Sequence, residues 1–191
     1  MKIFTHILLL ILVIVFSSGC VIRTLNPWLS EETSVSESKL QGVWFQDAED
    51  GFAEAYISHT ADGQYKVLLI ENGTARNLFV ATLHKIDDLY LLVAGPEKKE
   101  NLEEWVRLPG YLLFKADIQE NQLKIFGIND ELSTDIFKDS GLTLMEERGE
   151  FDGEIILSST VQLEEFVRAQ LPDPAFFDDE PFYDFRRISP R

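Results

Sequence analysis

The side chains that could carry out catalysis are few, and their spacing matches no catalytic motif. The chain has one cysteine, Cys20, and three histidines, of which His6 lies in the apolar start of the chain. His59 stands beside an expected turn and His84 at the end of an expected strand, so we expect both to be solvated rather than catalytic. The 33 acidic side chains offer carboxylates for general acid–base chemistry, but no spacing singles out a pair.

The short sequence patterns of enzymes are also absent. The chain contains no Gly-x-Ser-x-Gly, His-Glu-x-x-His, P-loop or Rossmann glycine pattern. The acidic run Asp178-Asp179-Glu180 lacks the spaced ligands and the glycine of a calcium loop. We therefore predict a protein that is not an enzyme and that holds neither a metal ion nor another cofactor.

The charge balance argues against one class of partner. With 17 basic and 33 acidic side chains the net charge is −16, whereas nucleic-acid binding depends on clustered Lys and Arg. The apolar share of 45% is ordinary for a globular protein, and 191 residues fit one domain with short additions. We expect no nucleic-acid partner.

The cysteine follows a segment that predicts export. Lys2 precedes an apolar run from Ile7 to Phe16, whose ten residues rise only about 15 Å as a helix, against about 30 Å for a bilayer core. This run is too short to span a membrane. Its length is typical of the apolar core of a secretory signal peptide.

The residues Ser17-Ser18-Gly19-Cys20 resemble the lipobox of bacterial lipoproteins, although Ser17 stands where that family usually carries Leu. The resemblance implies a signal peptide over residues 1–19, cleaved before Cys20, and acyl chains such as palmitate carried by a diacylglyceryl group on the Cys20 sulfur. It implies a lipid-anchored protein of the bacterial cell envelope, and Val21 favours the outer membrane if the cell has two membranes. The alternatives are an ordinary signal peptide or an uncleaved anchor, each with an incidental cysteine.

Residues 20–38 are expected to form the lipidated N-terminus and a flexible tether. From Ser30 onward they are Ser, Glu and Thr with almost no apolar side chain. Trp28 and Leu29 are exceptions that could dock on the domain or dip into the membrane interface, and we expect them to be incidental in a solvated linker. Residues 39–191 then form a single β-barrel domain.

From Leu40 onward, short apolar runs alternate with turn signals, which predicts an antiparallel meander. Asp62-Gly63 and Asn72-Gly73 supply the positive φ values of tight hairpin turns. Seven or eight such strands bury their apolar face by closing into a barrel, which we favour, or by splitting into a sandwich. The expected strands are 40–45, 52–59, 65–70, 78–83, 89–94, 111–118 and 123–128.

Two helices are expected after the strands: a short turn within 131–138 and a longer helix over about 160–171. Ser159 and Gln162 form a capping box for the longer helix, and a proline ends it. Its apolar stripe consists of Leu163, Phe166 and Val167. We expect this helix to pack against the outside or the mouth of the barrel.

Gly42-Val43-Trp44, in the first expected strand, resembles the Gly-x-Trp start of lipocalin-type barrels, in which the Trp plugs the closed end. The order of segments from Leu40 to Arg187 is similar to that of small uncharacterised bacterial proteins with lipocalin-like barrels and a C-terminal helix. The resemblance implies a fold class and no activity: mainly β, an antiparallel up-and-down lipocalin-like β-barrel with a short C-terminal α-helix.

The function expected from such a barrel depends on its interior, since eight strands enclose space for one small ligand or for packed side chains only. The large side chains expected in the lumen are Trp44, Tyr56, Phe79 and Phe114. We expect a membrane-anchored, non-enzymatic binding module for a small apolar ligand or lipid. The alternative is an envelope interaction or structural protein with a filled barrel that binds a protein partner.

The C-terminal stretch is the candidate surface for such a partner. Its aromatic side chains are interspersed with acids and precede Arg186-Arg187, and aromatic and Arg side chains are typical of interfaces. The candidate partner-binding residues are Phe176, Phe177, Phe182, Tyr183 and Phe185. Alternatively, this segment is the last strand and folds its aromatic rings onto its own barrel.

Overall fold

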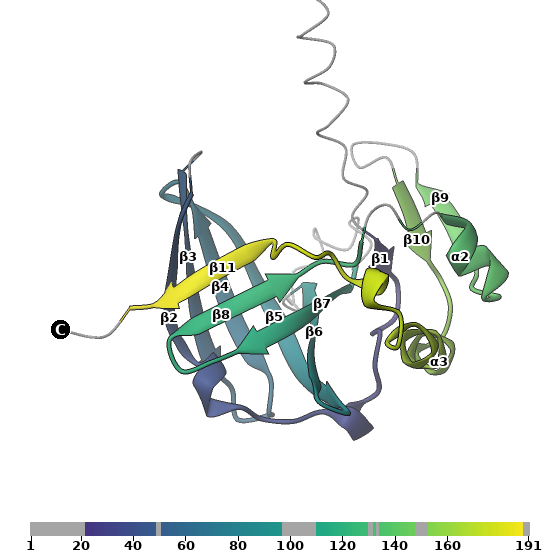
Figure 1. The fold of residues 1–191 in the computed structure, drawn as a ribbon, viewed down its shortest axis with the longest axis horizontal. Coiled ribbons are helices and arrows are strands. Elements are labelled where there is room, and N and C mark those ends of the chain that lie inside the picture. The colour runs from purple at the N-terminus through teal and green to yellow at the C-terminus, as the bar shows by residue number, and fades with distance from the viewer. Residues whose placement is uncertain are drawn as a thin grey trace, which may run out of the picture.

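The computed structural model describes residues 22–48, 51–96, 110–129, 132, 134–147 and 153–188, and Figure 1 shows their arrangement. The predicted signal peptide and Cys20 lie outside these ranges. Within them, no helix is long and apolar enough to cross a bilayer.

Eight antiparallel strands close into a barrel in the order β11-β2-β3-β4-β5-β6-β7-β8. The strands are β2 (Gly42–Ala48), β3 (Gly51–His59), β4 (Tyr65–Glu71), β5 (Thr74–Ile86), β6 (Leu89–Pro96), β7 (Leu112–Ile118), β8 (Gln122–Phe126) and β11 (Tyr183–Arg187). β2 to β8 pair in chain order, and β11, from the end of the chain, closes the gap between β8 and β2. The predicted barrel is confirmed, and closure removes the exposed sheet edges.

The hairpin turns of the barrel have the backbone that the sequence predicts. Between β4 and β5, Asn72 and Gly73 have φ values of 51° and 74°, and Gly63, between β3 and β4, has a φ of 84°. Gly tolerates positive φ freely, and Asn does so more readily than other side chains. Asn72 and Gly73 therefore allow β4 and β5 to reverse direction within two residues, whereas Gly63 lies in a five-residue connection, residues 60–64, between β3 and β4.

Side chains alternate between the lumen and the outside along each strand. On β3, Ala55 and Ile57 are buried, while Tyr56 between them is 40% exposed. The inward side chains form one apolar cluster, which we call the lumen core. Its largest fully buried members are Leu40, Trp44, Tyr65, Leu83 and Leu123.

The barrel has two ends, which we name by the strands that begin there. We call the end at which β2 begins the base, and there the 3-10 helix η2 (Ser38–Leu40) leads into the barrel. We call the opposite end the rim, and it is the end at which β3, β5, β7 and β11 begin.

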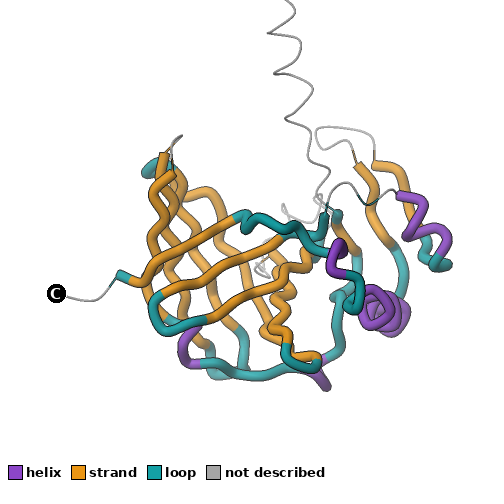
Figure 2. Tube along the Cα trace, in the orientation of Figure 1, coloured by secondary structure: helices purple, strands orange, loops and turns teal. Residues whose placement is uncertain are grey.

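A second group of elements covers one side of the barrel, as Figure 2 shows for its two α-helices. A three-stranded sheet has the order β1-β10-β9. The elements outside the barrel are β1 (Arg23–Thr24), η1 (Glu31–Thr33), α2 (Thr134–Asp139), β9 (Leu144–Glu147), β10 (Gly153–Ile156), α3 (Thr160–Gln170) and η4 (Pro174–Phe176). The short helix and the C-terminal helix thus lie where the sequence predicts them.

The helix α3 begins with the predicted capping box. The Ser159 hydroxyl accepts a hydrogen bond from the Gln162 amide N–H at 3.4 Å, and the Gln162 side-chain oxygen accepts one from the Ser159 amide N–H at 3.1 Å. The buried side chains of α3 are Leu163, Phe166 and Val167, the predicted stripe. This stripe packs against the outside of the barrel, one of the two places expected for it.

The elements outside the barrel bury a second apolar cluster, which we call the outer core. The barrel contributes the outward side chains Ile86, Leu91, Val93 and Leu113. From the covering elements, the Phe166 ring lies between those of Phe137 and Phe176, at centroid distances of 5.2 and 5.9 Å. Strands β5 to β7 are therefore apolar on both faces, one toward each core.

The expectation that Trp28 and Leu29 are incidental in a solvated linker is wrong, although several side chains between Glu31 and Ser38 are exposed. Trp28 is 0% exposed and Leu29 is 3% exposed, because both fill the outer core. The Trp28 indole N–H donates to the carbonyl of Tyr111 at 3.2 Å, and the amide N–H of Val35 donates to the carbonyl of Leu83 at 2.8 Å. Two large apolar side chains in a polar stretch therefore fasten the whole segment along the barrel wall.

Candidate functional site

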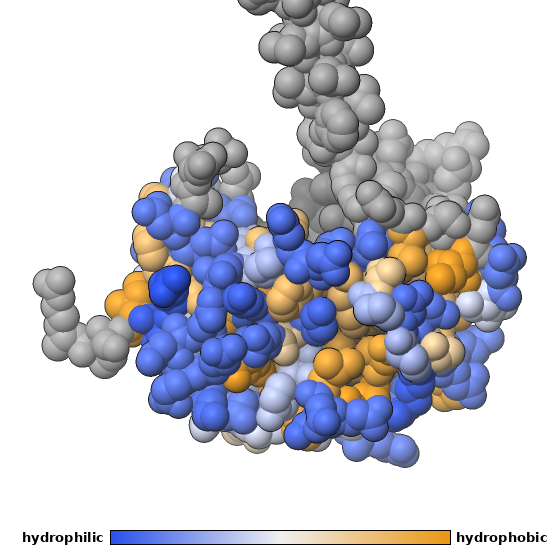
Figure 3. Space-filling view, in the orientation of Figure 1, coloured by the Kyte–Doolittle hydropathy of each residue, from blue (hydrophilic) through white to orange (hydrophobic). Residues whose placement is uncertain are grey.

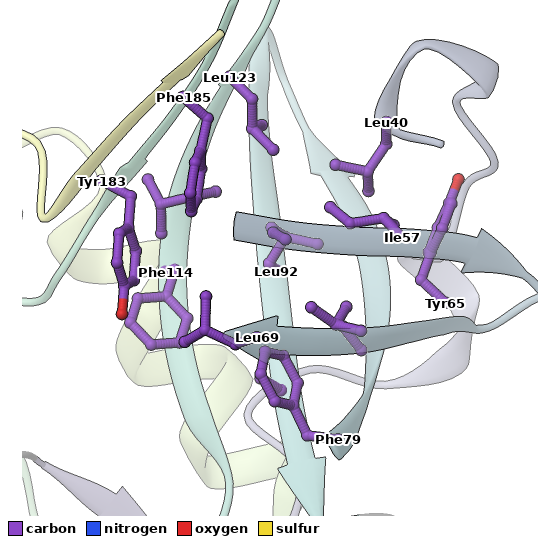
Figure 4. A pocket seen from close by; sticks show the side chains of 15 residues that line it. Leu40, Ile57, Tyr65, Leu69, Phe79, Leu92, Phe114, Leu123, Tyr183 and Phe185 are labelled. Atoms are coloured by element: carbon purple, nitrogen blue, oxygen red, sulfur yellow. The ribbon is translucent and has the colours of Figure 1, made fainter. Parts of the chain in front are cut away.

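The candidate site is a cavity of about 80 Å³ inside the barrel. Every strand of the barrel except β2 contributes to its wall, so the cavity occupies the lumen itself (Figure 4). The labelled lining residues are Leu40, Ile57, Tyr65, Leu69, Phe79, Leu92, Phe114, Leu123, Tyr183 and Phe185. Alanine and valine residues complete the lining, together with Ile125.

The wall of this cavity is apolar. None of its lining residues carries a charge, and the two tyrosines are the only ones with polar side-chain atoms. The Tyr65 hydroxyl accepts a hydrogen bond from the Glu37 amide N–H at 2.8 Å, and the Tyr183 hydroxyl donates to the Glu71 carboxylate at 2.9 Å. Both hydroxyls are thus bonded to groups outside the lining, and a cavity of this kind excludes water and favours apolar guests.

Trp44 and Arg187 close the base of the barrel. The Trp44 indole N–H donates to the carbonyl of Leu40 at 3.0 Å, and the Arg187 guanidinium carbon lies 4.3 Å from the centroid of the Trp44 ring. The guanidinium also donates to the backbone carbonyls of Lys39, Gln41 and Glu120. This arrangement places Trp44 at the closed end, as the resemblance to lipocalin-type barrels implies.

The rim carries a carboxylate directly above the apolar wall. Glu71 ends β4, and its hydrogen bond to Tyr183 links β4 to β11 across the lumen. Burial raises the pKa of the Tyr183 hydroxyl well above its usual value, and the neighbouring Glu71 carboxylate raises it further. The Tyr183 hydroxyl is therefore neutral at physiological pH and acts as a donor, and Glu71 is the acceptor.

The structure places the four predicted lumen residues in three different environments. Phe79 and Phe114 line the cavity, as expected. Trp44 is fully buried at the base and does not line the cavity. The prediction that Tyr56 faces the lumen is wrong, because Tyr56 occupies an outward position of β3 and is 40% exposed. Its neighbours Ala55 and Ile57, which alternation along the strand would have indicated, face the lumen instead.

The C-terminal aromatic residues mostly fold onto their own chain. Phe176 and Phe177 lie in the outer core and Phe185 in the lumen core, with exposures of 1%, 5% and 2%. Tyr183 lines the cavity, so the alternative in which this segment forms the last strand is the correct one for β11. Burial removes these side chains from any protein interface, and Phe182, at 66% exposure, is the one that remains available.

The two histidines in the described part of the chain, His59 and His84, lie in different environments, and His84 is not solvated as we expected. His59 is exposed, whereas His84 is only 2% exposed and lies under the N-terminal segment. Its Nδ1 is 2.9 Å from the Thr33 hydroxyl oxygen. Burial lowers the pKa of His84 to about 4, and the charge of Glu164 only partly opposes this shift. His84 is therefore a neutral, structural side chain at pH 7.

A second hollow lies outside the barrel between the end of α2 and α3. Gly141, Gln162 and Glu165 are among its lining residues, together with Phe166. This hollow has polar and apolar walls and is more open to solvent than the lumen cavity. The lumen is therefore the better candidate for a ligand site.

These features define a class of protein: a closed, eight-stranded antiparallel barrel of the lipocalin-like type, with a closed base and an apolar lumen. No family model, no curated protein and no solved structure matches the chain.

Proposed function

We propose that this protein is a lipid-anchored binding protein of the bacterial cell envelope, and that its barrel lumen takes up a small, neutral, apolar ligand. The observation that carries the proposal is the cavity of about 80 Å³ with an uncharged lining. If side chains filled the barrel, no cavity of this size would remain within the lumen core.

The size of the cavity limits the ligand. An engineered cavity of about 150 Å³ binds benzene, and pockets for drug-sized ligands occupy about 300–1,000 Å³. A cavity of about 80 Å³ is smaller than both, so it suits the end of a hydrocarbon chain. The rest of a longer ligand then lies at the rim.

The charges of the site favour a neutral ligand over a fatty acid. The lining has no cationic side chain that could pair with a carboxylate, and Glu71 stands at the rim. A carboxylate brought to the rim would be repelled by the Glu71 carboxylate. An alcohol or other uncharged head group avoids this repulsion.

The lipid anchor is the second part of the proposal, and it rests on the lipobox resemblance around Cys20. Two or three acyl chains, at about 0.8 kcal/mol per buried methylene group, would make the anchoring effectively permanent. Mass spectrometry of the membrane-extracted protein tests this part. The chain should begin at Cys20 and carry the added mass of the lipid, and the Cys20→Ala variant should be recovered without any lipid.

A series of straight-chain alcohols from four to twelve carbons tests whether the lumen binds a neutral, apolar ligand. Binding to the unlipidated Cys20→Ala chain is measured by calorimetry. Each added methylene should strengthen binding by about 0.8 kcal/mol, or roughly fourfold, until the chain fills the lumen. The length at which the gain stops measures the depth of the site. Carboxylates of the same lengths should bind more weakly at pH 7.

A matched pair of variants on β5 shows whether the alcohols bind in the lumen. Ala81 lines the cavity, so Ala81→Leu places three more carbon atoms inside it and should abolish alcohol binding. Val80, the next residue, faces outward, so Val80→Leu should leave binding unchanged. Equal binding by both variants would place the alcohols elsewhere and reject a lumen site.

A second candidate function, binding of an envelope protein, is favoured by the uncovered wall of the barrel. Val43, Tyr56, Leu68 and Leu78 are neighbours in register on four consecutive strands. Tyr56 is 40% and Leu78 is 46% exposed, whereas the face that carries β11 and β8 is largely hydrophilic (Figure 3). Site-specific crosslinking in cells from position 78, compared with position 61 at the base, tests this candidate. A defined partner crosslinked only from position 78 would support it.

A further inference from the structure

A short stretch of chain links the proposed lipid anchor to the rim of the barrel. Ile22, the first described residue, directly precedes β1. At β1, the amide N–H of Thr24 donates to the carbonyl of Tyr111 at 3.1 Å, and the amide N–H of Tyr111 donates to the carbonyl of Thr24 at 2.9 Å. Tyr111 leads into β7 at the rim, so the chain enters the domain at the rim (Figure 1).

This entry point is close to Cys20 in the sequence. Two residue steps separate Cys20 from Ile22, and a fully extended chain spans at most about 3.6 Å per residue. The backbone therefore reaches no more than about 7 Å from the lipid-bearing residue to the domain. A bilayer of about 40–45 Å with a hydrocarbon core of about 30 Å has a headgroup layer of about 5–7.5 Å on each side. The reach of the chain is therefore comparable to the thickness of one headgroup layer.

The segment after Ile22 gives no additional length, because it is fastened to the domain. Thr24 pairs with Ile156 of β10, and the Asn26 side-chain amide donates to the carbonyls of Leu157 and Ser158 at 3.4 and 3.0 Å. Trp28 follows, with 0% of its surface exposed. A lipid on Cys20 thus holds the rim, and not the base, next to the membrane.

The rim also exposes aromatic side chains of the kind found at membrane surfaces. Phe52, at the start of β3, is 37% exposed and stacks on Phe45 at a centroid distance of 6.2 Å. Phe182, just before β11, is 66% exposed and packs edge-on against Tyr183 at 4.9 Å. Exposed rings held by a second ring are rigid, so they enter a headgroup layer with little loss of conformational freedom.

The charge near the rim selects the type of surface. Asp179 and Glu180 are exposed in the segment that leads to Phe182, and the whole chain has a net charge of −16. An anionic bilayer would repel these carboxylates, whereas a zwitterionic one would not.

We infer that the protein docks with the rim of its barrel on the zwitterionic phospholipid surface that carries the Cys20 lipid, with Phe52 and Phe182 among the headgroups. This inference rests on the lipid anchoring in the proposed function. It also means that a ligand leaving the bilayer meets the lumen without crossing bulk water.

Depth-dependent fluorescence quenching tests this orientation with the complete, lipidated protein in phosphatidylcholine vesicles. A fluorophore is attached to Thr74→Cys at the rim or to Ala61→Cys at the base, and both positions are exposed. Cys20 is the only natural cysteine and its sulfur carries the lipid, so the introduced thiol alone is labelled. A nitroxide on the lipid headgroup should quench the rim probe at least threefold more than the base probe. Equal quenching, or stronger quenching at the base, would overturn the inference.

Two further variants separate the short anchor from the aromatic contacts. A fifteen-residue Gly-Ser insertion between Val21 and Ile22 should reduce quenching of the rim probe but not abolish it, because the rings still bind. Adding Phe52→Ser and Phe182→Ser to the insertion should make the quenching of the rim probe equal to that of the base probe. Val161→Ser, at an exposed site on α3, is the matched control and should change nothing.

The outcomes for docking and for ligand binding are distinguishable, since alcohol binding is measured without a membrane. Alcohol binding together with equal quenching would overturn the docking and retain the lumen site. Strong rim quenching without alcohol binding would support the docking and reject the lumen site. Recovery of the chain without a lipid on Cys20 would overturn both the anchor and the docking that depends on it.

Discussion

The lumen core and the outer core share three strands of the barrel but are built in different ways. The lumen core consists of inward side chains that alternate along regular strands, and it encloses the cavity. The outer core is assembled from the N-terminal segment, two helices and η4, and its aromatic rings pack against one another. On the proposed function, the outer core stabilises the protein and the lumen core holds the ligand.

The largest effect expected from this comparison concerns Trp28. Trp28→Ala removes a side chain that is 0% exposed and should lower the free energy of unfolding by about 3–5 kcal/mol. Urea unfolding of the Cys20→Ala chain measures it, with Val161→Ala at a site that is 67% exposed as the control, expected within about 0.5 kcal/mol. A loss below about 1 kcal/mol would mean that the N-terminal segment merely rests on the barrel.

Arg187 tests the base of the lumen core. Arg187→Ala removes three hydrogen bonds to backbone carbonyls and the contact with Trp44, and should lower the free energy of unfolding by about 2–3 kcal/mol. Arg186→Ala, at the exposed neighbouring position, should have little effect in the same unfolding experiment. Equal effects of the two variants would show that the closed base contributes nothing to stability.

Acid should weaken the outer core through His84. The pKa of His84 falls from 6.5 to about 4 on folding, so the unfolded chain binds a proton first as the pH drops. With respect to this group, the free energy of unfolding is therefore highest above pH 6.5. It falls as the pH drops below 6.5, and at pH 5 the loss is about 2 kcal/mol. Unfolding at pH 7 and pH 5 should therefore show a steeper loss for the natural chain than for His84→Gln. Parallel losses would rule out His84 as a source of acid sensitivity.

The smallest expected effect comes from adding carbon atoms to each core, which compares how tightly the two cores are packed. Ala81→Leu adds three carbons next to the cavity, so it should change the free energy of unfolding by less than about 1 kcal/mol. Val167→Leu adds a single carbon to the outer core, where Val167 is 0% exposed, and should destabilise by about 1–3 kcal/mol. The opposite order in thermal unfolding would mean that the lumen core is the more tightly packed of the two.

The strands of the barrel, their hairpin turns and the cap of α3 could be predicted from the sequence. Strand alternation and the Asn72-Gly73 turn carry local signals, because each depends on the preferences of a few adjacent residues. The capping box at Ser159 is local in the same sense, and it appears as predicted. Size alone is a poor guide to the lumen, because Phe79 and Phe114 line the cavity whereas Tyr56, expected there on the same ground, lies outside.

The N-terminal part of the outer core could not be predicted, because Trp28 and Leu29 follow no helical or strand period, whereas the α3 stripe of the same core could be predicted. Trp28 and Leu29 stand alone in a polar stretch, and only the apolar outer wall of β5 to β7, far away in the sequence, gives them a partner. His84 is buried for the same reason, since the segment that covers it is the one expected to be solvated. Long-range contacts of this kind override local composition, which is the signal that sequence reasoning uses.

The position of β11 has a consequence for how the chain is made. β8 ends at Phe126, but the strand that joins it to β2 begins only at Tyr183, so the barrel cannot close until almost the whole polypeptide has emerged. Until then the edges of β2 and β8 are both unpaired, and open edges invite pairing with other chains. A polypeptide truncated before β11 should therefore aggregate during synthesis, even though it retains most of the strands of the barrel.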